Sequence, residues 1–296
     1  MELTAGPEAA GDRLDAFLAG PLGSRSRAER LIVGGAVEVD GVRVQKRFKL
    51  LGGEHIVVDD APVSHEAAQG SDAQRAPFAV AYEDDDLLVV DKPAGVVVHP
   101  ARGHWTGTLA QALADRTGGG EDPSRIGIVH RLDKDTSGLL VVARSEEVHR
   151  RLKEALQART ITREYLALVD GRPPARTGTI DAPIGRDRGV RTRQSTDTDT
   201  PREARTHFEL EQALPRHTLL RVTLETGRTH QIRVHLQAIG HPVAGDQEYG
   251  RGAQLGLERQ FLHAARLRFE HPITGQPVDL ASELPVDLAA ALRQAS

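Results

Sequence analysis

Apolar positions near the N terminus follow two spacings, first that of helices and then that of strands. They recur at helical spacing over 13–22 and 27–33. Residues 37–44 then alternate between apolar and polar around an Asp-Gly pair, which is typical of a β-hairpin. Residues 55–58 have the composition of a further strand. The pattern over 11–60 therefore predicts a small module of two helices and a short sheet.

Apolar runs in the rest of the chain have the length of strands, and few helical segments separate them. The helix predicted at 145–158 begins at Ser145, a favourable N-cap, with Glu146 and Glu147 in its first turn. Because strands outnumber helices and seldom alternate with them, the pattern predicts an α+β fold with a mixed, mainly antiparallel sheet. The other predicted helices are 108–116, 229–239 and 286–293, and the predicted strands are 79–82, 87–91, 126–129, 139–143, 163–169, 206–211, 219–224 and 262–269.

A stretch with few large apolar side chains separates these two patterns. It contains Pro62, Ser64 and Gly70, and this composition is typical of a linker. We therefore expect three parts in the chain. They are an N-terminal module over 1–62, a linker over 63–76 and a larger domain over 77–296.

Composition excludes several kinds of chemistry. The 296 residues include no cysteine, which rules out disulfides, thiolate nucleophiles and cysteine-ligated metals. The first 25 residues carry four acidic side chains and no long apolar run, so no secretory signal is expected. The apolar runs are too short to span a bilayer, and we expect a cytoplasmic protein without a membrane partner. The net charge of −4 does not itself support nucleic-acid binding, although local basic patches act independently of net charge.

One polar stretch, residues 130–138, lies between two predicted strands and reads His-Arg-Leu-Asp-Lys-Asp-Thr-Ser-Gly. Loops held by a rigid sheet commonly carry catalytic groups. The carboxylates of this loop have cationic neighbours, which favour the ionised form. From composition alone, however, a turn with solvated charges is the better interpretation.

A second stretch, Thr-Gly-Arg-Thr-His-Gln-Ile-Arg-Val-His, follows a predicted strand. Gly227 permits a sharp turn into a helix, and Thr229 is suited to cap that helix. Arg233 has apolar neighbours, a setting in which arginine usually has a carboxylate partner, and a structural salt bridge is the simpler interpretation. His230 and His235 are five residues apart, which is not the spacing of a helical zinc pair. We interpret them as structural or RNA-facing, and no metal site is predicted.

These stretches resemble the signatures of a known family, the RluA-type pseudouridine synthases. Residues 130–138 match its pattern His-Arg-Leu-Asp, two variable residues and Thr-Ser-Gly, and 227–236 resemble its second long signature. Residues 90–100 and 262–272 resemble its opening and closing motifs. Residues 13–58 resemble an S4 domain, a small RNA-binding module. Five motifs in the family's order, over nearly the whole chain, are not expected by chance.

The resemblance implies that the chain isomerises uridines to pseudouridine in RNA, with 23S ribosomal RNA of the large subunit or a ribosomal precursor as partner. The reaction detaches the uracil, turns it and rejoins it through C5. The base keeps all its atoms, so no cofactor is expected. We also expect a monomer.

The resemblance carries roles to five residues. Asp133 corresponds to the catalytic aspartate, and Arg131 to an arginine that fills the space left by the extruded nucleotide. Tyr165, in the pattern Arg-Glu-Tyr, corresponds to the active-site tyrosine. Arg233 corresponds to the arginine paired with the aspartate. Leu262 is expected to complete the base pocket.

Basic side chains suited to RNA phosphates cluster in two places. One cluster lies in the N-terminal module. The other lies between 186 and 205, where arginine is interleaved with Thr and Asp, either as a disordered polar loop or as a flexible arm that grips RNA. The candidates are Arg25, Arg27, Arg30, Lys46, Arg47, Arg186, Arg188, Arg191 and Arg193.

Three other functions are compatible with parts of the pattern. The first is a non-catalytic RNA-binding or ribosome-assembly protein on the same fold, which the presence of Asp133, Tyr165 and Arg233 disfavours. The second is a C5 methyltransferase, which commonly needs a cysteine nucleophile. The third is a glycosidase using Asp133 and Asp135, which lie two residues apart in one loop rather than across a sugar.

Overall fold

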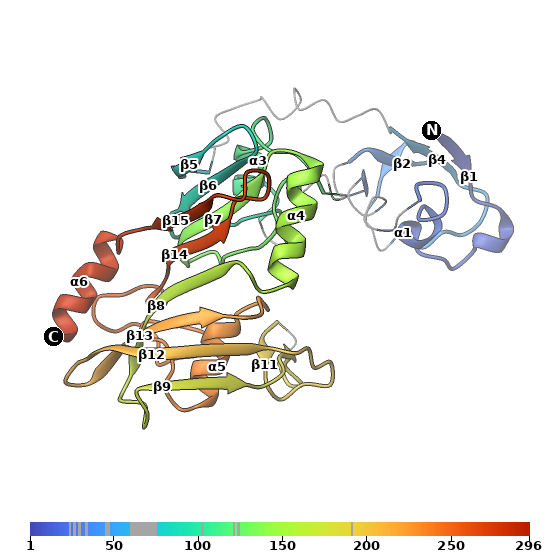
Figure 1. Ribbon diagram of the computed structural model, residues 1–296. Helices are drawn as coiled ribbons and strands as arrows, with labels where there is room; N and C mark the ends of the chain where they lie inside the picture. The colour runs from blue at the N-terminus through green and yellow to red at the C-terminus, as the bar shows by residue number, and fades with distance from the viewer. Residues whose placement is uncertain are drawn as a thin grey trace. The chain divides into compact units, whose positions relative to one another are not determined.

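The chain divides into two compact units, Met1–Ala73 and Gln74–Ser296, and each is described by itself (Figure 1). The computed structural model describes all residues except 24, 26–27, 29–30, 33–34, 45–47, 60–75, 102–103, 121, 123–124 and 191. Apart from Ala76, the predicted linker lies outside the described residues. Most of the predicted helix at 27–33 also lies outside them.

The first unit is built on a four-stranded antiparallel sheet in the order β1-β4-β2-β3. The predicted hairpin is confirmed. Its turn residues Asp40 and Gly41 both have positive φ, as the favoured two-residue turn requires. Its strands and helices are β1 (Glu2–Thr4), β2 (Val37–Val39), β3 (Val42–Arg43), β4 (His55–Val58), the 3-10 helix η1 (Pro7–Ala9) and α1 (Leu14–Phe17).

Helix α1 is shorter than the predicted helix at 13–22. Its Leu14 and the following Leu18 are fully buried against Val37 and Ile56 of the sheet. This small core accounts for the helical spacing of the apolar positions, although the regular helix ends at Phe17.

The second unit is built on a nine-stranded sheet in the order β5-β6-β7-β14-β8-β13-β12-β9, with β15 paired to β14. Among the described strands of this sheet only β14 and β7 pair in parallel, which confirms the predicted α+β fold with a mixed, mainly antiparallel sheet. The strands are β5 (Ala79–Glu83), β6 (Leu87–Lys92), β7 (Ser137–Ala143), β8 (Thr162–Asp170), β9 (Thr177–Asp181), β12 (Arg205–Ala213), β13 (His217–Leu224), β14 (Leu262–Glu270) and β15 (Pro277–Ala281). A separate pair is formed by β10 (Gly185–Arg186) and β11 (Gln194–Ser195).

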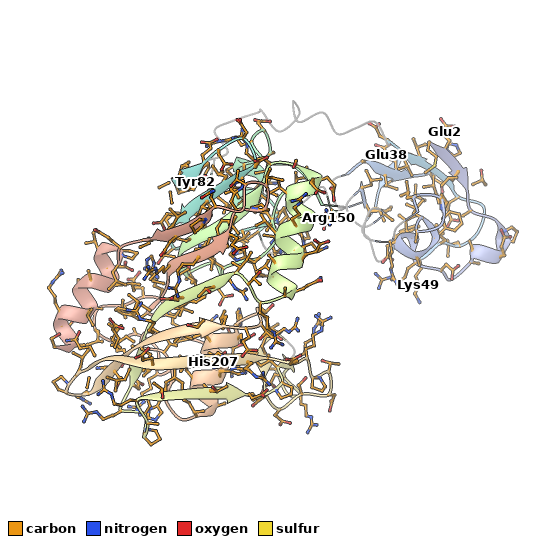
Figure 2. The ribbon with its side chains drawn as sticks, in the orientation of Figure 1. Glu2, Glu38, Lys49, Tyr82, Arg150 and His207 are labelled. Carbon is orange, nitrogen blue, oxygen red and sulfur yellow. The ribbon has the colours of Figure 1, made fainter. Side chains whose placement is uncertain are left out.

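Strand β7 is buried along its whole length, which explains its unbroken apolar sequence. Helix α4 (Glu146–Gln157) packs on one face of the sheet through Val148 and Leu152. The backbone N–H of Val148 donates to the Ser145 hydroxyl at 3.3 Å, so the predicted N-cap is confirmed. Arg150, labelled in Figure 2, forms ion pairs with Glu147 and Glu154 along the exposed side of the same helix.

The opposite face of the sheet is covered by three helices, α3 (Leu109–Ala112), α5 (Gln231–Ala238) and α6 (Val286–Ala295). All three were predicted, but α3 is shorter than expected. The prediction that Thr229 caps α5 is wrong. The N-cap is His230, which has a φ of 57° and makes no capping hydrogen bond through its side chain.

The prediction of a strand at 126–129 is also wrong. Its only pairing is an isolated bridge from Ile128 to Val142. Gly127 has a φ of +73°, which a continuous strand does not allow. The sequence analysis missed β1, β9, β10, β11 and β15, which are short or rich in polar residues.

The start of β7 depends on Gly138, at the end of the polar loop 130–138. Its φ is +113°, and a Cβ atom at this position would lie 2.3 Å from the carbonyl oxygen of Ala264 on β14. Only glycine therefore allows the two parallel strands to approach each other this closely.

We predict that Gly138→Ala destabilises the protein strongly, by about 3 kcal/mol or more, because backbone strain adds to a backbone clash. Thermal unfolding measures the effect. Gly252→Ala is the control, because Gly252 has a φ of +79° but no atom within 4 Å of the added Cβ. Equal losses in the two variants would contradict the close approach of β7 and β14.

Candidate active site

One cavity of about 540 Å³ opens on the side of the sheet that α5 covers. Its volume lies within the range of small-molecule sites. It is lined by all five residues to which the resemblance gave roles at the site, namely Asp133, Arg131, Tyr165, Arg233 and Leu262. The structure therefore brings together residues that are distant in the sequence.

Arg233, on α5, is held by a buried carboxylate that the sequence analysis did not assign to the site. Its Nε and Nη2 atoms donate to the two carboxylate oxygens of Asp246 at 2.7 and 3.0 Å. The side chains are 8% and 0% exposed. Two parallel charge-assisted bonds of this kind fix the plane of a guanidinium. Asp246 is itself fixed, because it accepts backbone N–H groups from Glu248 and Tyr249.

The remaining nitrogen of this guanidinium faces Asp133. Nη1 lies 3.4 Å from Oδ2 of Asp133, whose side chain is 15% exposed. The predicted pairing of Arg233 with Asp133 is therefore present, but it is longer than the pairing with Asp246. Burial alone would lower the pKa of Arg233, whereas Asp246, Asp133 and Glu248 raise it, so the guanidinium is charged.

Tyr249 packs against the same guanidinium and links it to the β10–β11 pair. The guanidinium carbons of Arg193 and Arg233 each lie 4.8 Å from the centre of its ring. Its hydroxyl accepts the backbone N–H of Gln194 at 2.9 Å and shares a hydrogen bond with His230. Burial raises the pKa of Tyr249 to about 12. The segment 186–205, considered above as a disordered loop or an arm, is thus tied to the cavity.

Tyr165 lies on β8 and is 5% exposed. Burial raises the pKa of its phenol, Arg163 opposes this shift and Asp133 adds to it, so the ring is neutral at physiological pH. A neutral aromatic face at the cavity wall is suited to stack on a base.

Lys92, at the end of β6, holds the loop that carries Asp133. Its ammonium is fully buried and donates to the carbonyl oxygens of Pro93, Val96 and Lys134 at 2.8, 2.9 and 2.9 Å. Burial lowers its pKa to about 7, and the nearby Asp135 and Asp133 oppose that shift. The three carbonyl groups connect the opening motif to the residue next to Asp133.

The histidines near the cavity are neutral. Burial lowers the pKa of His99 to about 4 and that of His130 to about 3. His130 accepts the N–H of Val141 through Nε2, which places its proton on Nδ1. His235 is fully buried and bonded to Thr206 and to a backbone carbonyl, so it is structural.

The described arginines among the RNA-binding candidates have different surroundings. Arg25 pairs with Asp15 at 2.9 Å, and Arg188 pairs with Asp197 and Asp199. Arg186 is exposed. Five candidates, Arg27, Arg30, Lys46, Arg47 and Arg191, lie outside the described residues.

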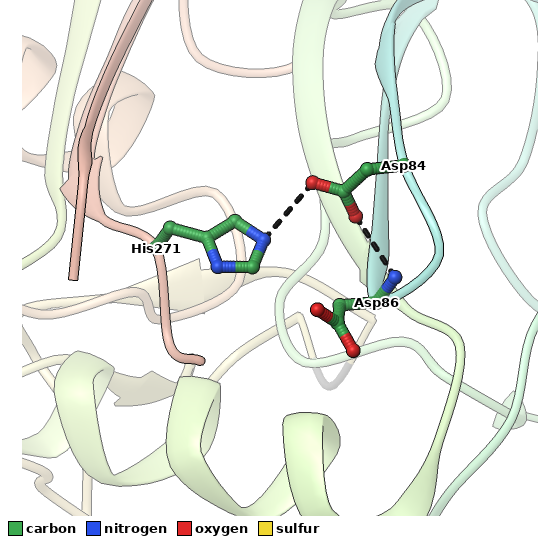
Figure 3. Close-up of side chains that lie close together, drawn as sticks. All are labelled: Asp84, Asp86 and His271. Carbon is green, nitrogen blue, oxygen red and sulfur yellow. Dashed lines mark hydrogen bonds and ion pairs between the residues drawn. The ribbon is translucent and has the colours of Figure 1, made fainter. Parts of the chain in front are cut away.

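Within the described part of the chain, one group of side chains has the spacing of metal ligands, and it comprises Asp84, Asp86 and His271 (Figure 3). Oδ1 of Asp84 already accepts the N–H groups of Asp86 and Leu87 at 2.8 Å. Oδ2 accepts the hydroxyl of Tyr82 and bonds to His271 at 3.0 Å. These bonds give the cluster a structural role, because they hold the segment after β14 against the β5–β6 turn.

No helix among the described residues is long and apolar enough to cross a membrane. This finding agrees with the strand-sized apolar runs of the sequence.

Comparison with known proteins identifies the family. Residues 86–238 match the family model described as RNA pseudouridylate synthase, and 12–56 match the S4 domain. The chain is 45% identical to a ribosomal large subunit pseudouridine synthase D of Nitrosomonas europaea, over 99% of this chain and 87% of the relative. It is 43% identical to an uncharacterized RNA pseudouridine synthase of Bacillus subtilis, over 98% and 96% of the two chains.

A solved structure supports the same assignment. Human RNA pseudouridylate synthase domain containing 1 superposes with a TM-score of 0.55 at 29% identity, over 71% of this chain and 84% of that one. The chain belongs to the RNA pseudouridylate synthase family and carries an S4 domain.

Among the residues around Arg233 that the sequence analysis missed, Asp246 had a detectable signal. A buried arginine usually has a carboxylate partner, and Asp246 lies in the Gly-Asp pair that follows the second signature. Tyr249 and Glu248 follow directly after it, but nothing in their spacing indicates which side chain they contact.

We predict that Asp246→Asn lowers the free energy of unfolding by about 3–5 kcal/mol, because it leaves the buried Arg233 guanidinium without its main counter-charge. Chemical denaturation measures the loss. Asp287→Asn is a matched control, because Arg259 contacts Asp287 with the same two distances, 2.7 and 3.0 Å, but Asp287 is 48% exposed. That control should lose about 1 kcal/mol or less. Similar losses in both would contradict the importance of burial.

Proposed function

We propose that this chain isomerises uridines of large-subunit ribosomal RNA to pseudouridine, with Asp133 as the catalytic carboxylate. The observation that carries the proposal is the cavity in which Asp133 lies between a fixed guanidinium and the tyrosine at position 165. The substrate class is supported by relatives at 42–45% identity that are named ribosomal large subunit pseudouridine synthase D.

The target atoms of a stacked nucleotide are inaccessible, so the nucleotide must be flipped out, at a cost of about a few kcal/mol. Arg131 is exposed at the cavity, and it forms no ion pair with any described residue. It is therefore available to occupy the vacated place in the RNA. The extruded uracil then stacks on Tyr165, whose ring face accepts the base in either orientation, and Leu262 closes the apolar side.

Asp133 acts on the sugar, either by bonding to the anomeric carbon or by removing a sugar proton. Carboxylates form covalent intermediates with sugars. Arg233 is a positioning residue in this proposal, because its bonds to Asp246 fix the direction from which its third nitrogen meets Asp133. The composition of the base does not change, because the hydrogen lost from C5 is replaced by one gained at N1, so the reaction needs no cofactor.

The S4 module is proposed to bind RNA phosphates, with residues 1–62 as the module, 63–76 as the linker and 77–296 as the catalytic domain. We place the reaction in the cytoplasm and expect the chain to act as a monomer. Lys49, labelled in Figure 2, is one described basic residue of the module.

We predict that Asp133→Asn abolishes turnover while RNA affinity is retained, because the side chain keeps its size but loses its charge. Tritium release from C5 of uridine-labelled ribosomal RNA measures turnover, and filter binding measures affinity. Asp135→Asn, in the same loop, is the control and should retain most of the rate. Normal tritium release from Asp133→Asn would refute the proposed mechanism.

We predict that deletion of residues 1–65 weakens binding to ribosomal RNA and flattens the dependence of affinity on salt, because phosphate contacts are lost. Titrations at several salt concentrations measure both. The far-UV circular dichroism of the second unit should be retained. Undiminished affinity with an unchanged salt slope would argue against RNA binding by the S4 module.

A further inference from the structure

A second buried arginine lines the cavity and has no assigned role. Arg163 lies on β8 and is 7% exposed. Its Nε atom is buried without a hydrogen-bond partner, and its Nη2 atom lies 3.5 Å from the carbonyl oxygen of Leu224. No ion pair joins it to a carboxylate of the described chain. A buried cation without a counter-charge costs several kcal/mol.

The neighbouring carboxylate cannot neutralise Arg163, because it lies on the other face of the sheet. Successive side chains of a strand point to opposite faces. Glu164 is held there by Arg221, at 3.1 Å, and by Arg268. Two arginines therefore contact one carboxylate on that face, whereas no described carboxylate pairs with Arg163 on the cavity face.

The chain makes room for this unpaired guanidinium at Gly227. A Cβ atom at that position would lie 2.9 Å from Nη1 of Arg163. Gly227 is not among the glycines with positive φ, so its backbone conformation is open to other residues. The absence of a side chain at 227 therefore leaves space for the guanidinium. It is not required by the backbone conformation of a turn.

Arg163 and Tyr165 share the cavity face of β8, because they are two residues apart. Their Cα atoms are separated by about 7 Å along the strand. A base stacked on the Tyr165 ring would therefore have its polar edge within reach of the Arg163 side chain.

Building on the proposed function, we propose that Arg163 is a catalytic residue that binds the carbonyl oxygens of the flipped uracil and stabilises the charge on the detached base. When the glycosidic bond breaks, its electron pair leaves with the base, which becomes an anion. The charge disappears when C5 bonds to the anomeric carbon, C5 loses its proton to solvent and N1 gains one. A buried cation that already lies beside the base is most effective during that interval.

The depth of Arg163 favours the base over a backbone phosphate as its ligand. Arg131 also lines the cavity, but its side chain is exposed and suited to the hydrated phosphates. A phosphate would have to leave water to meet Arg163, whereas the uracil enters the cavity as the reaction requires.

The test uses the full chain and ribosomal RNA labelled with tritium at C5 of uridine. Arg163→Met should lower the single-turnover rate by about 100-fold or more, the usual effect of removing one such charge-stabilising contact. Its melting temperature should be equal to or higher than that of the wild type, because an uncompensated buried charge has been removed. Arg221→Met is the control, and it should keep the rate while losing stability, since it breaks an ion pair.

A second variant keeps the arginine but displaces it. Gly227→Ala should also slow the reaction, with little change in stability. The double variant Gly227→Ala/Arg163→Met should be no slower than Arg163→Met alone.

RNA with a neutral methylphosphonate beside the target uridine should react with the wild type at an unchanged rate.

Three results would overturn the inference while the wild type releases tritium. These are an unchanged rate in Arg163→Met, a lower melting temperature in that variant, and a methylphosphonate effect as large as the loss of Arg163. The absence of tritium release from the wild type would instead remove the proposed function, and the inference with it.

Discussion

The buried ion pair between Arg233 and Asp246 is the constraint from which the geometry of the cavity follows. Asp246 is fully buried and holds two nitrogens of the guanidinium, so the third nitrogen has one direction available. That direction leads to Asp133, on a loop between β6 and β7 that a buried lysine fastens to the sheet. The carboxylate is thereby placed without being tightly paired. A short bidentate bond to Asp133 would have used the oxygens that the proposed reaction needs.

The two deeply buried arginines of the cavity differ in how their charge is balanced. The guanidinium on α5 is surrounded by three carboxylates and stacks on Tyr249, so it serves as part of the frame. Arg163 has no such partner among the described residues, and the adjacent carboxylate of Glu164 is occupied on the far face of β8. A fold gains no stability from an uncompensated cation, and such groups are expected where a ligand supplies the missing charge. This contrast distinguishes an arginine that supports the cavity, Arg233, from one that is available to bind a ligand, Arg163.

Much of the fold was predictable from the sequence, because long apolar runs and hairpin signals report burial directly. Strands β6, β7, β8 and β14 and helix α4 are examples. The strand expected at 126–129 does not form, because Gly127 adopts a positive φ. The sign of φ at a glycine depends on tertiary packing. The resemblance named five residues, and all five line one cavity. Tyr249 and Arg163 were missed as site residues because their importance lies in which groups face them in the folded chain. Spacing along one chain does not record that information.

A structure of the Asp133→Asn chain bound to a fragment of large-subunit ribosomal RNA tests the central claim most directly. The account predicts one uridine extruded from the RNA, with its uracil stacked on Tyr165 and its anomeric carbon facing residue 133. RNA bound with all of its bases stacked and the cavity empty would contradict it.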